Sequence, residues 1–232
     1  MSFETKQAAI TRKGREFFSG LGGPIRSKAA AIKITGSLGK PSKMPGLSYG
    51  ISAALCKVGA ALAKIEGSTC SGCYALKANY QYPSVKAAHA KRAEGLDHPQ
   101  WADAMIYLIG SSGETYFRWH DSGDLQSFQH LLNIVKVAEA LPAVSFWLPT
   151  REKALVLQYQ RSFGSFPSNL VVRVSAAMID SAAPAGFQHT STVHARAAAQ
   201  GYSCPAQQQG NKCQDCRACW DASVSNVSYH QH

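Results

Sequence analysis

The chain has 232 residues with a formal net charge of +10, and hydrophobic residues make up 45% of it against 16% charged residues. These proportions exclude an intrinsically disordered chain, and the length fits one domain with a substantial core. No apolar run approaches the roughly 18 residues of a membrane span, and the first residues lack the apolar stretch of a secretion signal. We therefore expect a single cytoplasmic domain over residues 1–232.

Residues 1–50 are basic and rich in Gly, Pro and Ser, which is typical of turns. We expect an irregular basic wrap here, with one short strand at Ala29–Ile34. The positive charge suits an anionic partner such as nucleic acid, although no nucleic-acid-binding motif supports that interpretation. Solubility alone is a sufficient explanation of the charge.

A first group of cysteines opens segment 51–180, which we expect to form the core. Cys56 is followed by thirteen residues, then by Cys70 and Cys73 in a C-x-x-C arrangement. A reducing cytoplasm rarely keeps structural disulfides, and seven cysteines cannot all pair with one another. A metal site is the better interpretation, and three thiolates on a four-iron cluster would leave one iron open.

The rest of this segment alternates between strand and helix patterns. A helical pattern runs over residues 84–109 with a break near residues 97–99. The elements expected after it are strand 115–119, helix 127–140, strand 144–148, helix 152–160 and strand 170–174. Such alternation predicts an α/β fold, either a partial (βα) barrel or an open parallel sheet.

Polar residues follow each expected strand, where α/β proteins carry their functional groups. His120-Asp121-Ser122-Gly123-Asp124 follows the first strand, Thr150-Arg151 the second, and Ser175 ends the third. His120 and Asp124 are the candidate catalytic residues, since imidazole and carboxylate groups transfer protons. A hydrogen-bonded histidine without chemistry is the alternative for His120.

A second group of cysteines lies in the C-terminal segment 181–232. Cys204 is followed by Cys213, Cys216 and Cys219 in a C-x-x-C-x-x-C run. This spacing is similar to that of bacterial iron–sulfur proteins, whereas structural zinc is the main alternative and usually takes two separated pairs. The seven cysteines can hold two clusters as three plus four, or share one cluster with free thiols left over.

Three stretches of sequence resemble a poorly characterised bacteriophage protein family, which is in turn similar to radical SAM enzymes. They are residues 67–77 around the first C-x-x-C, Arg118–Asp124, and Phe146–Arg151, and the C-terminal cysteine run accompanies them. The resemblance covers roughly residues 50–221. It implies a partial (βα) barrel, a phage-encoded protein in the host cytoplasm, and a [4Fe-4S] cluster on Cys56, Cys70 and Cys73.

The resemblance also implies a cofactor, S-adenosylmethionine, bound at the open iron. Tyr74 occupies the aromatic position after C-x-x-C, and Ser122-Gly123-Asp124 resembles the Gly-Gly-Glu segment that holds the methionine amino group. The first cysteine spacing is longer than in radical SAM enzymes, and the second group would hold an auxiliary cluster. The expected cofactor-binding residues are Tyr74, Ser122, Gly123, Asp124, Thr150, Arg151 and Ser175.

Three functions fit these patterns. The first is a radical SAM-like enzyme that acts on an unknown small-molecule or macromolecular substrate. The second is a non-radical hydrolase, in which an iron of the cluster acts as a Lewis acid beside His120 or Asp124. The third is a non-enzymatic binding module held together by a structural cluster.

Overall fold

All strands of the described chain run parallel in one open sheet. The computed structural model describes residues 24–231, and the order of its strands is β1-β2-β3-β4-β5-β7-β6. The strands are β1 (Leu47–Tyr49), β2 (Tyr116–Trp119), β3 (Ser145–Thr150), β4 (Leu170–Ser175), β5 (Thr190–His194), β6 (Tyr202–Ser203) and β7 (Asn226–His230). The predicted α/β fold with an open parallel sheet is confirmed, and the linear order leaves β1 and β6 as edges.

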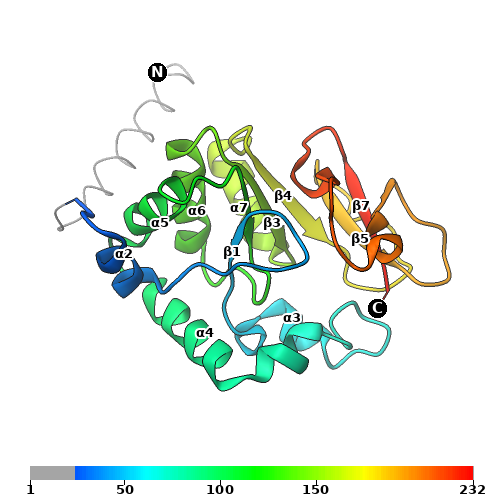
Figure 1. Ribbon diagram of the computed structural model, residues 1–232. Coiled ribbons are helices and arrows are strands. Elements are labelled where there is room, and N and C mark those ends of the chain that lie inside the picture. The colour runs from blue at the N-terminus through cyan, green and yellow to red at the C-terminus, as the bar shows by residue number, and fades with distance from the viewer. Residues whose placement is uncertain (1–23, 232) are drawn as a thin grey trace, which may run out of the picture.

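Helices connect the first four strands and cover one face of the sheet (Figure 1). Helix α6 (Phe128–Ala140) joins β2 to β3, and α7 (Lys153–Phe163) joins β3 to β4, as the crossover of parallel strands requires. The other helices are α2 (Lys28–Thr35), α3 (Val58–Leu62), α4 (Pro83–Gly95) and α5 (Trp101–Gly110). Short 3-10 helices are η1 (Ala53–Leu55), η2 (Tyr74–Leu76), η3 (Ala78–Gln81), η4 (Pro205–Gln209) and η5 (Ala218–Trp220).

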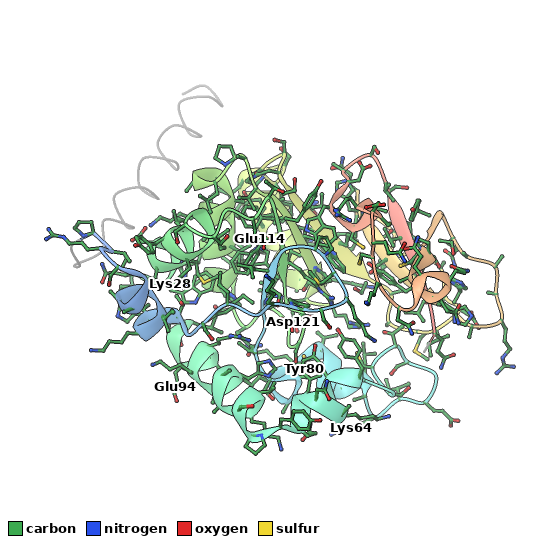
Figure 2. The ribbon with its side chains drawn as sticks, viewed as in Figure 1. Lys28, Lys64, Tyr80, Glu94, Glu114 and Asp121 are labelled. Atoms are coloured by element: carbon green, nitrogen blue, oxygen red, sulfur yellow. The ribbon has the colours of Figure 1, made fainter. Side chains whose placement is uncertain are left out.

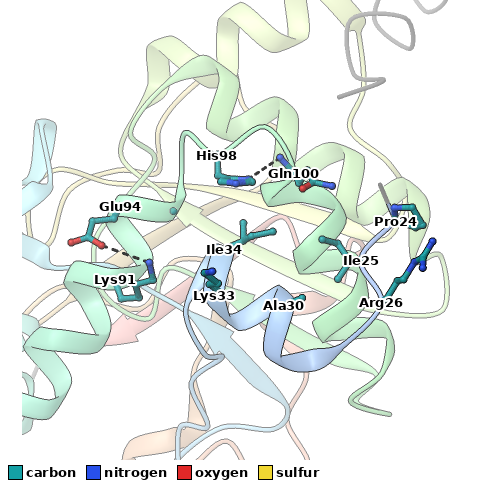
Figure 3. Close-up of a pocket in the computed structure, with 11 residues that line it drawn as sticks. Pro24, Ile25, Arg26, Ala30, Lys33, Ile34, Lys91, Glu94, His98 and Gln100 are labelled. Atoms are coloured by element: carbon teal, nitrogen blue, oxygen red, sulfur yellow. Dashed lines mark hydrogen bonds and ion pairs between the residues drawn. The ribbon is translucent and has the colours of Figure 1, made fainter. Parts of the chain in front are cut away.

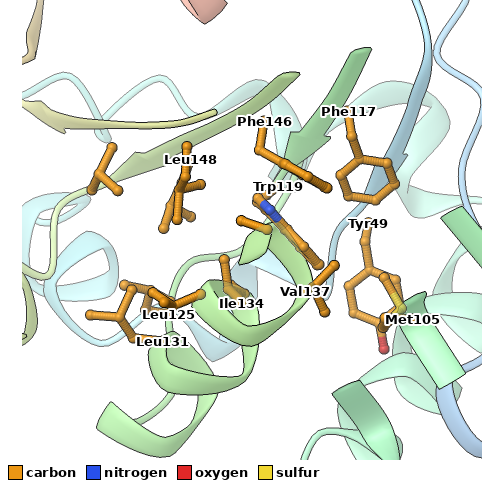
Figure 4. Close-up of a cluster of buried hydrophobic side chains, with 14 of the residues drawn as sticks. Tyr49, Met105, Phe117, Trp119, Leu125, Leu131, Ile134, Val137, Phe146 and Leu148 are labelled. Carbon is orange, nitrogen blue, oxygen red and sulfur yellow. The ribbon is translucent and has the colours of Figure 1, made fainter. Parts of the chain in front are cut away.

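The main core lies between the sheet and its helices (Figure 4). Phe117 pairs with Phe146 in the strand register, and both side chains are fully buried on the helix-covered face. Trp119 packs edge-on against Phe117 at a ring distance of 4.8 Å and lies parallel to Phe146 at 6.1 Å. Burial of each large apolar side chain contributes about 1.5–3 kcal/mol, so this layer fixes the strands that support the site.

The strand predicted at Ala29–Ile34 is wrong, because these residues belong to helix α2. Three successive alanines favour a helix, and the Ser27 hydroxyl caps its start by accepting a hydrogen bond from the Ala30 amide at 3.1 Å. The predicted wrap 1–50 therefore contains one helix and the edge strand β1 in its described part. Residues 1–23 of that segment lie outside the described residues.

The C-terminal segment holds strands as well as cysteines. Strands β5, β6 and β7 extend the sheet beyond β4, in the segment 181–232 that the sequence predicted only to be rich in cysteine. None of the helices in residues 24–231 combines the length and hydrophobicity that a membrane span requires.

Candidate metal centres

The first cysteine loop is fastened to the carboxyl ends of β3 and β4. Thr69 donates its amide to the Ala177 carbonyl at 2.9 Å and its hydroxyl to the Ala176 carbonyl at 3.1 Å. Arg151 then donates to the Thr69 hydroxyl at 2.6 Å. These bonds hold Cys70 at the edge of the sheet where parallel α/β proteins bind their ligands.

Cys56, Cys70 and Cys73 converge in this loop. A Cβ atom on Gly59 would lie 3.6 Å from the Cys56 sulfur and 3.7 Å from the Cys70 sulfur, so both sulfur atoms border the same space. Burial raises the pKa of Cys56 to about 12, and the nearby charges of Asp124, Cys73 and Cys70 raise it further. A cation bound beside these sulfur atoms would favour the ionised form of Cys56 and so offset the rise in its pKa.

The predicted residues Asp124, Thr150 and Arg151 form one buried network beside these cysteines. Thr150 donates its hydroxyl to Asp124 Oδ1 at 2.6 Å, and the Arg151 amide donates to Oδ2 at 2.8 Å. The Leu125 amide completes the set at 2.8 Å from Oδ1. Burial raises the pKa of Asp124 to about 6, although these donors oppose the rise. The carboxylate thus ties the end of β2 to the end of β3.

The other predicted cofactor-binding residues lie around this network without joining it. Gly123 has a φ of 81°, and a Cβ there would stand 2.4 Å from Ile51, so only glycine fits this turn. Ser122 is buried and its hydroxyl has no partner among the described residues. Ser175 accepts a hydrogen bond from the hydroxyl of Ser191 on β5 at 3.0 Å. Tyr74 donates its hydroxyl to the Asp121 carbonyl at 2.8 Å.

His120 is buried, with 3% of its surface exposed, and has a left-handed backbone with a φ of 54°. Its ring faces the His130 ring of α6 at a centroid distance of 5.3 Å. Neither ring nitrogen has a hydrogen-bond partner in the described chain; the Pro149 carbonyl lies close to the ring but outside hydrogen-bond geometry. Burial, followed by His130 and Arg118, lowers the pKa of His120 well below its usual value. Its catalytic role stays a prediction.

The second cysteine group covers the opposite face of the sheet. The Cys219 sulfur lies 3.2 Å from the Tyr229 hydroxyl of β7, and the Cys216 sulfur lies 3.4 Å from the Tyr202 hydroxyl of β6. Electrostatic repulsion from Cys204 and Cys216 raises the pKa of Cys213, and repulsion from Cys204 raises the pKa of Cys219. Burial raises the pKa of Cys219 to about 12 and also raises those of Cys204 and Cys213. The four thiols thus lie close enough to influence one another's ionisation.

Arg173 of β4 holds the loop that carries Cys219. Its side chain is fully buried and donates to the carbonyl groups of Ala218 at 2.8 Å, Asp221 at 2.9 Å and Cys219 at 3.0 Å. Two longer contacts, both of 3.4 Å, reach the carbonyl groups of Thr190 and Ser225. Arg173 therefore points to the face of the sheet that the second group covers and acts as an anchor.

Arg118 lies between the two cysteine groups. Its guanidinium stacks over the Trp147 ring at 4.5 Å and donates to the Tyr74 hydroxyl at 3.4 Å, beside the first group. Its charge also reaches Cys213 and Cys219, where it opposes the rise in pKa caused by burial. The seven cysteines therefore fall into a group of three and a group of four.

A single metal ion and a four-iron cluster require different spacings of their cysteine ligands. A tetrahedral zinc site places its sulfur atoms about 3.8 Å apart, given a Zn–S distance of about 2.3 Å. In residues 24–231, no three Cys, His, Asp or Glu side chains are arranged to hold one metal ion. Ligands of a four-iron cluster bind different iron atoms, so they stand farther apart than ligands of a single ion.

A hollow of about 550 Å³ lies away from both cysteine groups (Figure 3). Residues of α2 and α4 line it, including Lys33, Ile34 and Lys91, and the last of these pairs with Glu94 at 3.8 Å. It contains none of the predicted site residues, so the candidate chemistry does not coincide with this hollow.

Several residues that shape the two centres were missed from the sequence. Thr69, Glu152 and Tyr229 position cysteines through hydrogen bonds, and Glu152 does so by accepting from the Val58 amide at 3.1 Å. Only Tyr229 carried a signal, because the alternation of Asn226–His230 is compatible with a strand.

These features define an α/β protein whose open parallel sheet carries cysteine groups at its carboxyl edge and on one face. Over residues 25–222, the sequence matches the phage-associated protein family described as Gene product 88, and the chain belongs to that family. Comparison with curated proteins and with solved structures gives no significant match. The expected membership of a phage-associated family is confirmed, while the relation to radical SAM enzymes stays a prediction.

Proposed function

We propose that this protein is an enzyme of radical SAM-like type that works in the host cytoplasm and holds a [4Fe-4S] cluster on Cys56, Cys70 and Cys73. The observation that carries the proposal is the position of these cysteines at the carboxyl ends of β3 and β4. Three thiolate ligands leave one iron of such a cluster open, and this edge of the sheet is where α/β folds bind substrates.

The residues around the three cysteines fit a cluster. Thiolate sulfur is the usual ligand of iron–sulfur centres, and hydrogen bonds and solvent exposure then tune them. Gly59 leaves free the space beside the Cys56 and Cys70 sulfurs, where a side chain would stand less than 4 Å from both.

A bound cluster would supply one-electron chemistry at its open iron, together with S-adenosylmethionine. The chain's own contribution is to hold the site rigid, because Asp124 joins Thr150 and Arg151 across two strands. Arg151 then fixes the cysteine loop through Thr69. Ser122 and Gly123 lie at the turn where the resemblance places the methionine amino group.

The second group supports an auxiliary cluster that is closed by its own ligands, Cys204, Cys213, Cys216 and Cys219. Four thiolates saturate such a cluster, so any reactive iron belongs to the first group. The hydrolytic alternative has less support, because Asp124 already uses both carboxylate oxygens for hydrogen bonds to Thr150, Leu125 and Arg151.

Iron content in two cysteine variants tests the proposal. Protein purified without oxygen should contain iron and sulfide and show an EPR signal after reduction, and Cys73→Ala and Cys216→Ala should each lose part of the iron. Partial and additive losses support two clusters, and complete loss in both variants would mean one shared cluster. Full iron retention in Cys73→Ala, or stoichiometric zinc without iron in the wild type, would contradict the first centre.

Binding of S-adenosylmethionine separates the radical enzyme from the other iron–sulfur functions. Wild-type protein with its cluster should bind this cofactor in calorimetry, whereas Cys73→Ala should not, and Cys216→Ala serves as the matched control. If the wild type carries its cluster but does not bind S-adenosylmethionine, radical SAM chemistry is excluded. The hydrolase and the binding module would then be the remaining functions.

A further inference from the structure

Exposed apolar side chains are concentrated around the first cysteine group. Eight large hydrophobic side chains of the described chain are strongly exposed, and six of them fall between residues 55 and 82. These six are Leu55, Val58, Ile65, Tyr74, Leu76 and Tyr82. The two tyrosines are the most exposed of all, with exposed fractions of 55% and 57%. Such a concentration on one segment marks an interaction surface rather than scattered surface residues.

The elements of the segment that carries these side chains are neighbours in space. Helix η1 contacts both α3 and η2, η2 contacts η3, and η3 contacts the start of α4. Figure 1 shows this part of the chain as a lobe beside the sheet, and Figure 2 places Lys64 and Tyr80 within it. We call the exposed side chains of residues 53–86 the 53–86 surface.

The 53–86 surface is also basic. Residues 53–86 contain four lysines and a single acidic residue, Glu66. The lysines are Lys57, Lys64, Lys77 and Lys86, and all four are exposed. Their charge adds to a chain that already carries +10. The patch therefore combines aromatic faces with cations, which is the composition of surfaces that bind single-stranded nucleic acids.

We propose that the 53–86 surface binds single-stranded nucleic acid, with bases stacked on Tyr74 and Tyr82 and phosphates near the lysines. Protein–protein interfaces are depleted of lysine, whereas nucleic-acid interfaces are strongly positive, so four lysines favour a polyanion over a protein partner. Tyr74 suits stacking because its hydroxyl is already held by the Asp121 carbonyl, which limits the side-chain entropy lost on binding. The inference names a macromolecular ligand beyond the proposed iron centre.

A pair of charge reversals tests the surface against the protein's overall charge. The first variant, Lys57→Glu with Lys64→Glu, changes the 53–86 surface. The second variant, Lys28→Glu with Lys33→Glu, changes exposed positions on α2, and Figure 2 shows Lys28 on a different part of the molecule from Lys64. Each pair lowers the formal net charge from +10 to +6, so general attraction falls equally in both. Binding of a fluorescein-labelled oligothymidine of about 20 nucleotides is measured by fluorescence anisotropy at several salt concentrations.

The expected result is a loss of about tenfold or more for the Lys57/Lys64 pair and a much smaller loss for the Lys28/Lys33 pair. Tyr82→Ala should weaken binding about tenfold with an unchanged salt slope, since stacking adds no counterion release. Equal losses in the two charge-reversed pairs would overturn the inference in favour of general charge. Tighter binding of a duplex of equal length would also overturn the inference. So would a wild type that does not bind oligothymidine, and in that case a protein would be the better candidate partner for the surface.

Discussion

The histidine that follows β2 shows how one backbone angle decides the surroundings of a side chain. His120 follows a strand and precedes Asp121, a setting that predicted a catalytic residue at the sheet edge. The left-handed backbone at its φ of 54° instead accompanies a ring buried against His130. The sequence predicted that His120 follows a strand, but not this orientation of its ring, because a positive φ is uncommon outside glycine even for histidine, which is enriched there.

The two buried histidines predict a loss of stability in acid. Burial lowers the pKa of His130 to about 3, and that of His120 also lies well below its usual value. Below a pH of about 6.5 the unfolded chain therefore binds protons that the folded chain does not, and the free energy of unfolding falls by about 1.4 kcal/mol per pH unit for each histidine. Asp124 opposes this trend, because its raised pKa of about 6 stabilises the fold as pH falls toward 4.

His130→Leu should thus reduce the pH dependence of stability by about 1.4 kcal/mol per unit between pH 6 and 4, measured by urea unfolding. His98→Leu, at an exposed position, is the control for the loss of an imidazole ring. An unchanged slope in His130→Leu would show that this ring is charged in the folded protein.

Tyr229→Phe is expected to lower the reduction potential of the proposed C-terminal cluster. A hydrogen bond from the Tyr229 hydroxyl to the Cys219 sulfur stabilises the more negative, reduced state, and its loss corresponds to about 20–60 mV for one electron. Tyr202→Phe is the matched control, since Tyr202 is 40% exposed and water can replace its bond to Cys216. Redox titration followed by EPR measures both, and equal potentials for wild type and Tyr229→Phe would contradict the assignment.

At the scale of elements, the central strands could be predicted because they are apolar, and the outer ones could not because they are polar. Phe146 and Val172 belong to strands that fill a hydrophobic core, which gives a strong pattern. Strands β5 and β7 instead pair through hydroxyl and amide groups, with Thr192 donating to Ser228 at 3.0 Å and Thr190 to Asn226 at 2.8 Å. Such buried polar pairs are satisfied only after the strands meet, so β5 and β7 lack the continuous apolar run that marks the central strands.

Arg173→Met should release the C-terminal cysteine loop from β4. The substitution leaves carbonyl groups of Ala218, Cys219 and Asp221 without their donor, at an expected cost of about 3 kcal/mol or more in the free energy of unfolding. Arg118→Met, on β2, is the matched control and should cost about 1 kcal/mol, since its guanidinium mainly stacks on Trp147. Urea unfolding measures both, and similar losses would refute the anchoring role of Arg173.

The whole molecule combines a main hydrophobic core that contains none of the seven cysteines with two cysteine-bearing parts attached to it, and Cys219 belongs to a smaller hydrophobic cluster in the second of these parts. The main core lies between the sheet and the helices on one face. The first cysteine group lies in the half-exposed 53–86 segment, and the second lies among loops on the other face. The proposed clusters would therefore order the loops and not the core, because metal binding stabilises the segments that supply the ligands.

Removal of iron should accordingly leave the secondary structure intact while exposing the loops. Protein treated with a chelator without oxygen should keep its far-UV circular dichroism and become sensitive to trypsin at Lys64, Lys212 and Arg217 first. Mass spectrometry of the early fragments identifies the cleavage sites, and the iron-loaded protein is the control. Cooperative loss of the circular dichroism signal together with the iron would mean that the core itself depends on the clusters.

The order of the last three strands has a consequence for the timing of synthesis. Strands β1 to β5 line up in the order in which a ribosome produces them, but β7 lies between β5 and β6. The nascent chain therefore emerges with β5 as an open edge and with β6 unable to pair, until residues 226–230 arrive and close the gap. A message truncated before residue 226 would yield a product that contains the segments of β1 to β6 but has an unprotected edge at β5, the kind of edge on which chains aggregate.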